Sequence, residues 1–182
     1  MSGPTELYFY PILALSVIAA ITDFFWGRIY NWLTLPAIFL GMIAAATLGG
    51  WWGIGNALLG IMTGFLLYGW MFWLGHMGAG DVKLLMALGA WGGFRFSFEV
   101  GIFGILVGGV IAFLTLLFLG RLKKFTRKLY IFIVTLFIKE LSVEMPEIDK
   151  KLTMPYGVPI AVAAIWVMLG NPLERWGVLP WH

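Results

Sequence analysis

Six apolar runs divide the chain, and they restrict its possible folds more than any other feature. A helix needs about 20 apolar residues to cross a membrane, with a range of about 17–25. Three of the runs meet this length, and we expect the shorter ones to begin in flanking turns or to line the protein interior. The sequence therefore predicts an all-α integral membrane protein with about six transmembrane helices. The runs lie at residues 7–22, 33–50, 54–75, 82–96, 98–119 and 156–170.

Composition supports this prediction. A hydrophobic share of 61% with only 12% charged residues excludes an ordinary soluble domain. At 182 residues the chain has the length of one domain, so we expect a single polytopic domain over residues 1–182. The first six residues lack the basic start of a signal peptide, which indicates that the first run is a permanent span. The chain has no cysteine, which excludes disulfides, thiolate zinc sites and cysteine nucleophiles.

A seventh apolar segment, from Tyr130 to Ile138, lies between Lys128 and Lys139. Its nine residues are too few to cross a membrane. Cations at both ends are typical of a segment that lies in the headgroup region. We therefore expect a short cytoplasmic interfacial helix near residues 129–141.

The basic residues predict an orientation. Cytoplasmic loops carry an excess of Lys and Arg, and this excess is strongest when both termini lie outside. Ten of the 12 basic residues then fall in inner loops, and only Arg95 and Arg175 fall outside. Because topology explains the net charge of +3, we expect no nucleic acid as a partner. Membrane lipid is the expected environment, and the oligomeric state is left open.

Two aspartates return to the same membrane face in this topology. Asp23 ends the first apolar run, and Asp81 ends the turn Gly78-Ala79-Gly80-Asp81 before the fourth. Ionisable groups at membrane depth are costly, which makes them functional candidates. The chain crosses the membrane twice between Asp23 and Asp81, so both lie at the same face. It crosses twice more before residues 154–159, which therefore also lie at that face. The sequence predicts that these three segments converge.

A carboxylate pair can hydrolyse a peptide without a metal. One carboxylate activates water, the other protonates the carbonyl, and the pair shares one proton. We expect Asp23 to follow a helix C-terminus, which disfavours its ionised form, and Asp81 to open a helix, which favours it. This favours Asp81 as the base, although a coupled pair titrates as a unit. We expect no metal and no other cofactor, because the two histidines are isolated and no phosphate-binding motif is present.

Simpler roles exist for each aspartate alone. Asp81 could be a helix N-cap, and Asp23 could pair with Arg28. A different class of function is a small proton- or cation-coupled membrane transporter that uses both acids. A third is a structural subunit in which the glycines only pack helices.

Three segments together resemble the type IV prepilin peptidase family, the GxGD-type membrane aspartyl proteases that include the preflagellin peptidases. They are Asp23 with residues 28–34, then residues 78–85 with 87–89, and residues 155–161. Tyr30 departs from the family pattern, in which Pro commonly precedes Asn31. Only about ten residues separate the first two apolar runs. The likeness is therefore to the compact form without the cysteine-containing domain that accompanies methyl transfer, as in peptidases of tight-adherence pili or archaeal flagella.

The resemblance implies that Asp23 and Asp81 are the catalytic pair of a leader peptidase. It implies a pilin-like or flagellin-like precursor as the substrate, cut at the cytoplasmic face of the inner (cytoplasmic) membrane. Gly78, Gly80 and Lys83 would form the active-site loop. An acidic cluster before the last apolar run could attract a basic leader. The expected substrate-binding residues are Asn31, Pro155, Tyr156 and Gly157, with Glu144 and Glu147 of this acidic cluster.

Overall fold

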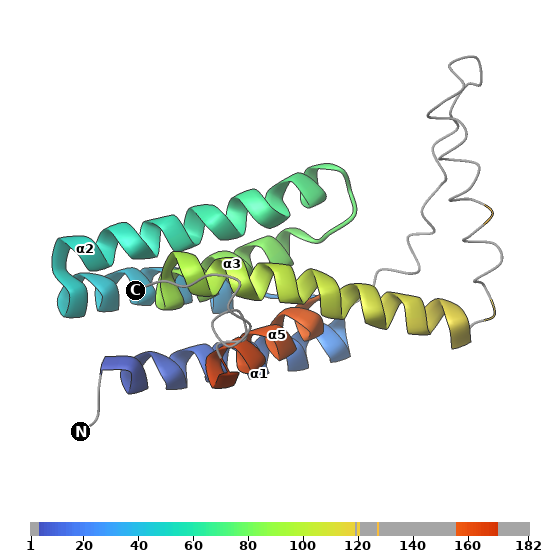
Figure 1. The fold of residues 1–182 in the computed structure, drawn as a ribbon, viewed down its shortest axis with the longest axis horizontal. Helices are drawn as coiled ribbons and strands as arrows, with labels where there is room; N and C mark the ends of the chain where they lie inside the picture. Colours follow the sequence, from blue (N-terminus) through green and yellow to red (C-terminus); the bar gives the residue numbers. More distant parts are fainter. Residues whose placement is uncertain (1–3, 119, 121–126, 128–155, 171–182) are drawn as a thin grey trace, which may run out of the picture. The chain divides into compact units, whose positions relative to one another are not determined.

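The computed structural model describes residues 4–118, 120, 127 and 156–170 (Figure 1). Regular structure in these residues is entirely helical, as the sequence predicts. The expected interfacial helix near 129–141 lies outside the described residues. The helices are α1 (Pro4–Trp26), α2 (Asn31–Trp73), α3 (Ala79–Phe118) and α5 (Gly157–Gly170).

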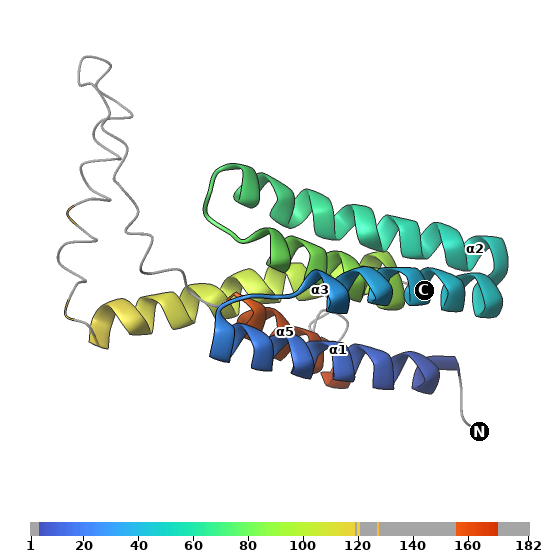
Figure 2. The same ribbon diagram turned by 180° about the vertical axis from the view of Figure 1, so that it is seen from behind.

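Helices α2 and α3 each contain a sharp reversal at a glycine. Gly50 has φ 55° and Gly93 has φ 79°, a left-handed backbone that glycine adopts without steric cost. Figures 1 and 2 show the chain turning back on itself at both places. The two helices therefore supply four antiparallel segments, which correspond to the second to fifth apolar runs.

The break at Gly50 lies where the apolar pattern predicts it, but the break at Gly93 does not. The predicted boundary between residues 96 and 98 is wrong by a few residues. Asn56 of α2 explains the shift, because its Oδ1 accepts a 3.1 Å hydrogen bond from the N–H of Phe94. This bond caps the start of the second segment of α3 from a distant part of the chain.

Three helices are long and apolar enough to cross a membrane, counted over the part of the chain that the structure describes. They are Tyr8–Trp26, Asn31–Trp73 and Ala79–Thr115, and the 14-residue α5 is a shorter apolar helix. Large apolar side chains cover the outer surface, among them Trp52 at 90% exposure and Trp73 at 87%. Such a surface suits a protein whose surrounding solvent is lipid.

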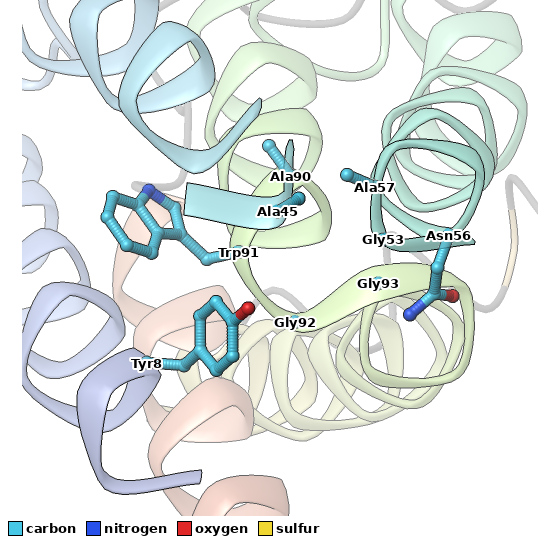
Figure 3. A pocket seen from close by; sticks show the side chains of 9 residues that line it. All are labelled: Tyr8, Ala45, Gly53, Asn56, Ala57, Ala90, Trp91, Gly92 and Gly93. Atoms are coloured by element: carbon cyan, nitrogen blue, oxygen red, sulfur yellow. The ribbon is translucent and has the colours of Figure 1, made fainter. Parts of the chain in front are cut away.

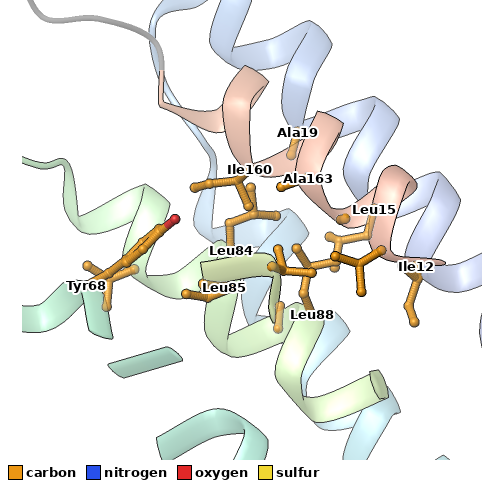
Figure 4. Packing of buried hydrophobic residues seen from close by; sticks show 14 of the residues in the cluster. Ile12, Leu15, Ala19, Tyr68, Leu84, Leu85, Leu88, Ile160 and Ala163 are labelled. Carbon is orange, nitrogen blue, oxygen red and sulfur yellow. The ribbon is translucent and has the colours of Figure 1, made fainter. Parts of the chain in front are cut away.

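The first segment of α3 forms the centre of the core. Leu84, Leu85 and Leu88 are completely buried. Figure 4 shows them surrounded by side chains from the other helices. Asp81 therefore lies in the first turn of a helix that is packed on several sides. The surrounding side chains are Ile12, Leu15 and Ala19 of α1, Tyr68 of α2, and Ile160 and Ala163 of α5.

Small residues allow the helices to approach closely. A methyl group added to Gly64 of α2 would lie 2.8 Å from the backbone nitrogen of Met86 in α3. One added to Gly60 would collide with the carbonyl of Gly89. These contacts confirm a packing role for the Gly60–Gly64 spacing.

The described residues up to Gly108, together with α5, form one compact unit. The described residues between Gly109 and Met154 belong to a second unit. The core and both pockets described below lie in the first unit. The single domain over residues 1–182 stays a prediction.

Candidate active site

Asp23 lies in the last turn of α1 and is only 5% exposed. The expectation that it follows the end of a helix is wrong, because α1 continues to Trp26. Its Oδ2 accepts a 2.6 Å hydrogen bond from the N–H of Gly157, the first residue of α5. A bond from an otherwise free helix-start N–H fixes this carboxylate between two helices.

Asp81 lies in the first turn of α3 and is 7% exposed. Its Oδ2 accepts a 3.1 Å hydrogen bond from the N–H of Gly78, just before the helix. Asp81 is therefore the third helical residue and not the N-cap, and its side chain reaches back to the N-cap position. The same closeness restricts the side chain at position 78. A methyl group on Gly78 would lie only 3.0 Å from Asp81 Oδ2.

One pocket of about 350 Å³ joins the two aspartates. It is formed by the end of α1, the connection to α2 and the start of α3. Its position shows that chain segments separated by nearly 60 residues meet there. Together with the bond from Gly157, this is the convergence that the sequence predicts. The pocket is lined by Asp23, Gly27, Arg28, Ile29, Tyr30, Asn31, Gly78, Gly80 and Asp81.

The connection between α1 and α2 forms one wall of this pocket. Gly27 has φ 61°, and its N–H donates a 2.8 Å hydrogen bond to the carbonyl of Asp23, which ends the helix. At the other end of the connection, where α2 begins, Asn31 Oδ1 accepts a 2.9 Å hydrogen bond from Lys83 Nζ. The Lys83 side chain thus ties α3 to the start of α2.

The simple ion pair between Asp23 and Arg28 is not formed. Within the described residues the salt bridge joins Arg95 Nε to Glu99 Oε1 at 3.1 Å, away from the pocket. Arg28 instead is exposed and lines the pocket beside the aspartates.

Other candidates lie differently from the sequence expectation. Tyr156 does not line the pocket, and its ring packs near Gly108, where an added methyl group would lie 3.0 Å from it. Pro155, Glu144 and Glu147 lie outside the described residues. Sequence reasoning did not select Ile29, although its place in the matching segment between Asp23 and Asn31 was a usable signal.

A second pocket of about 240 Å³ surrounds the reversal at Gly93 (Figure 3). Tyr8 and Trp91 pack edge to face on one side of it, with ring centroids 6.4 Å apart. Among the described residues that line it there is no Asp, Glu, His, Lys or Arg. It is lined by Tyr8, Ala45, Gly53, Asn56, Ala57, Ala90, Trp91, Gly92 and Gly93.

A metal site needs several donor side chains close together. In the described part of the chain, no three His, Asp or Glu side chains gather in a way that could hold a metal ion. The expectation that no metal or cofactor is needed stays a prediction.

Comparison with known proteins adds an independent observation. Residues 10–113, more than half of the chain and including both aspartates, match the type IV leader peptidase family. The prepilin leader peptidase/N-methyltransferase of Pseudomonas aeruginosa is 33% identical over 122 residues, which cover 63% of this chain and 40% of that protein. The protein of the same name from Aeromonas salmonicida is 38% identical over 85 residues, covering 43% and 29%.

The corresponding Aeromonas hydrophila protein is 40% identical over 70 residues, covering 35% of this chain and 24% of its own length. The chain thus spans less than half the length of these curated relatives. No solved structure matches the chain.

Proposed function

Because the chain belongs to the type IV leader peptidase family, we propose that it is a membrane-embedded aspartyl endopeptidase. Its proposed reaction is removal of the basic leader from type IV pilin-like or archaeal flagellin precursors. One observation carries the proposal: Asp23 and Asp81, from different helices, line the same pocket. Both are buried to more than nine-tenths, and burial disfavours two negative charges at one site, which supports a pair that shares one proton.

The hydrogen bonds divide the oxygens of each carboxylate between structure and chemistry. Backbone amides of Gly157 and Gly78 donate to Oδ2 of Asp23 and of Asp81, respectively. Oδ1 of each aspartate is thus the atom we assign to water, substrate or the shared proton. A pair held in this way supports a dyad in which either carboxylate can exchange its proton with the reacting groups.

In the proposed reaction, one ionised carboxylate removes a proton from water as the water oxygen attacks the scissile carbonyl carbon. The protonated carboxyl donates its proton to the carbonyl oxygen, which gives a neutral gem-diol. Cleavage then transfers a proton to the leaving amine, breaks the C–N bond and restores one proton on the pair. No covalent enzyme intermediate forms, so both carboxylates must be positioned before the chemistry begins.

The pocket wall suits an extended peptide. Gly78 and Gly80 present backbone without side chains beside Asp81, which lets a substrate backbone approach. Asn31, held by Lys83, is our proposed substrate contact at the start of α2. We assign Gly157 a role through Asp23, because its N–H already binds that carboxylate.

For the membrane arrangement, we propose that α2 and α3 each cross twice, with both chain termini outside. Supporting this, Arg28 and Lys83 lie at or beside the pocket, whereas Arg95 follows the reversal at Gly93. The positive-inside rule then assigns the pocket to the cytoplasmic face of the cytoplasmic membrane. Because the chain has no cysteine, single-cysteine variants can test this. His76→Cys should react with a membrane-impermeant thiol reagent only after the membrane is opened, and Trp52→Cys should react in intact cells.

The function itself is tested with purified protein in lipid vesicles and a pilin-like precursor. We expect a product shortened at the junction between leader and apolar helix, identified by mass spectrometry. The alternative function is a small proton- or cation-coupled transporter. It predicts an intact precursor and an ion flux that depends on Asp23 and Asp81, and that result would overturn the proposal.

A further inference from the structure

Ile29 lies at the middle of the connection between α1 and α2 and contacts the neighbours of both aspartates. A methyl group added to Gly80 would lie 3.0 Å from Ile29 Cβ and 3.1 Å from the Ile29 carbonyl oxygen. One added to Gly157 would lie 2.9 Å from Ile29 Cδ1. The Ile29 side chain therefore packs directly on two glycine backbones, one from α3 and one from α5.

Each of these two glycines is connected to one of the carboxylates, one through the chain and one through a hydrogen bond. Gly80 precedes Asp81 in the first turn of α3. Gly157 donates its N–H to Asp23 Oδ2. Ile29 also lines the pocket between the aspartates and packs against the main hydrophobic core. Shortening this side chain thus removes its contact with Gly157 on the Asp23 side, while the Cβ and backbone contacts with Gly80 on the Asp81 side remain.

We propose that Ile29 is a positioning residue, whose side chain sets the separation between the carboxylates of Asp23 and Asp81. This inference rests on the peptidase function proposed above. Ile29 has no group that could take part in the chemistry itself. Its effect comes from filling the space between the start of α3 and the start of α5.

The rest of the connection is anchored, so it does not compensate for a smaller side chain. The N–H of Gly27 is bonded to the carbonyl of Asp23, and Asn31 is bonded to Lys83. When the side chain at position 29 is cut back, the gap therefore opens beside Gly157 and is filled by movement of Gly157. This movement displaces the Asp23 carboxylate relative to that of Asp81, because protein interiors are closely packed.

The test is a graded series of variants in the vesicle cleavage assay. Ile29→Val removes the Cδ1 methyl that contacts Gly157 and keeps the Cβ atom that contacts Gly80. Ile29→Ala removes the whole branched side chain beyond Cβ. A misplacement of about 1 Å costs about 10²-fold in rate, so we expect Ile29→Ala to lower kcat by about that factor. Ile29→Val should lower kcat only several-fold, and KM should stay within about 3-fold of wild type in both.

Ile38→Ala is the matched control. Ile38 is a half-buried isoleucine of α2 that packs on the same core but does not line the pocket. Its truncation removes the same atoms and should lower the thermal unfolding temperature without lowering kcat by more than about 2-fold. A loss of kcat in Ile29→Ala alone, at unchanged KM, separates positioning from general destabilisation.

The outcomes distinguish this inference from the proposed function. If the wild-type protein does not cleave the precursor, the proposed function fails. If wild type cleaves and folded Ile29→Ala keeps the wild-type kcat, or if Ile38→Ala loses as much, only the positioning role is overturned. Should Ile29→Ala fail to fold, Ile29→Val decides: a several-fold lower kcat supports the role, and an unchanged kcat contradicts it.

Discussion

The N–H of Gly157, which begins α5, donates a 2.6 Å hydrogen bond to Oδ2 of Asp23 in the last turn of α1. The two residues are 134 positions apart in the chain. A bond between a helix-start amide and a buried carboxylate fixes the carboxylate and also satisfies an amide that the helix leaves free. The last described helix thus positions one of the two proposed catalytic groups directly.

Gly157→Ala should therefore impair catalysis more than stability. The added methyl group would lie 2.8 Å from Asp23 Oδ2 and 2.9 Å from Asp23 Cβ, so the carboxylate must move. We expect cleavage to fall by about 10²-fold, as for a misplacement near 1 Å. The cost of overpacking in unfolding free energy should be about 1–3 kcal/mol. Initial cleavage rates and thermal unfolding in detergent measure the two effects.

Gly55→Ala is the control for that substitution. Gly55 is a helical glycine of α2, and a methyl group there would meet no atom within 4 Å. Alanine favours a helix over glycine by about 1 kcal/mol, so this variant should be at least as stable as wild type and fully active. Wild-type cleavage by Gly157→Ala would show that the bond to Asp23 is not needed for activity.

The hydrogen bond between Lys83 and Asn31 should show itself as coupling in a double-mutant cycle. Asn31→Ala and Lys83→Met each break the 2.9 Å bond that ties α3 to the start of α2. Because the bond is exposed, we expect a coupling energy of only about 0.5–1 kcal/mol in kcat/KM. The double variant should then be little worse than either single one. Fully additive losses would mean that the two residues act independently.

The sequence predicts the helical character, the break between apolar runs near residue 50 and the meeting of Asp23 with Asp81. These follow from apolar run lengths and from counting crossings, which depend on local composition. The reversal at Gly93 could not be located in this way. It depends on the cap that Asn56 provides from another helix, and such a long-range contact leaves no periodic signal.

The supporting contacts of the site were also not predictable. The packing of Ile29 on Gly80 and Gly157 depends on three-dimensional proximity and not on spacing in the chain. Lys83 is predicted only as part of the active-site loop, and its bond to Asn31 comes from the fold. Ile29 and Lys83 both lie in segments that match the family pattern. Such a pattern does not show which residue a side chain contacts in the folded protein.

The acidic cluster before α5 gives a prediction from sequence alone. It comprises Glu140, Glu144, Glu147 and Asp149, outside the described residues. Their replacement by Gln or Asn should raise KM for a substrate with a basic leader and weaken its salt dependence. Screening acts over about 8 Å at physiological salt, so the effect should be largest at low ionic strength. An unchanged KM with an unchanged salt response would exclude this cluster from leader recognition.

Removal of metal ions should leave cleavage unchanged. In the proposed reaction the two carboxylates supply both the base and the acid, so no step needs a cation. The measurement compares rates before and after EDTA treatment of the purified protein. A loss that one divalent ion restores would contradict this prediction and give the aspartates a role as metal ligands.

The central claim is that cleavage needs both carboxylates of the pocket. Asn has nearly the same shape as Asp, so Asp23→Asn and Asp81→Asn should retain the hydrogen-bonded fold while removing an acid or a base. Glu99→Gln is the control, since it changes a carboxylate that is 2% exposed and lies outside the pocket.

The decisive measurement is therefore the turnover of a pilin-like precursor by these three variants in lipid vesicles. General acid–base catalysis contributes about 10²–10⁴-fold, so each aspartate variant should lose at least about 10²-fold while Glu99→Gln stays within a few-fold of wild type. Near wild-type turnover by a folded Asp23→Asn or Asp81→Asn protein would contradict the dyad.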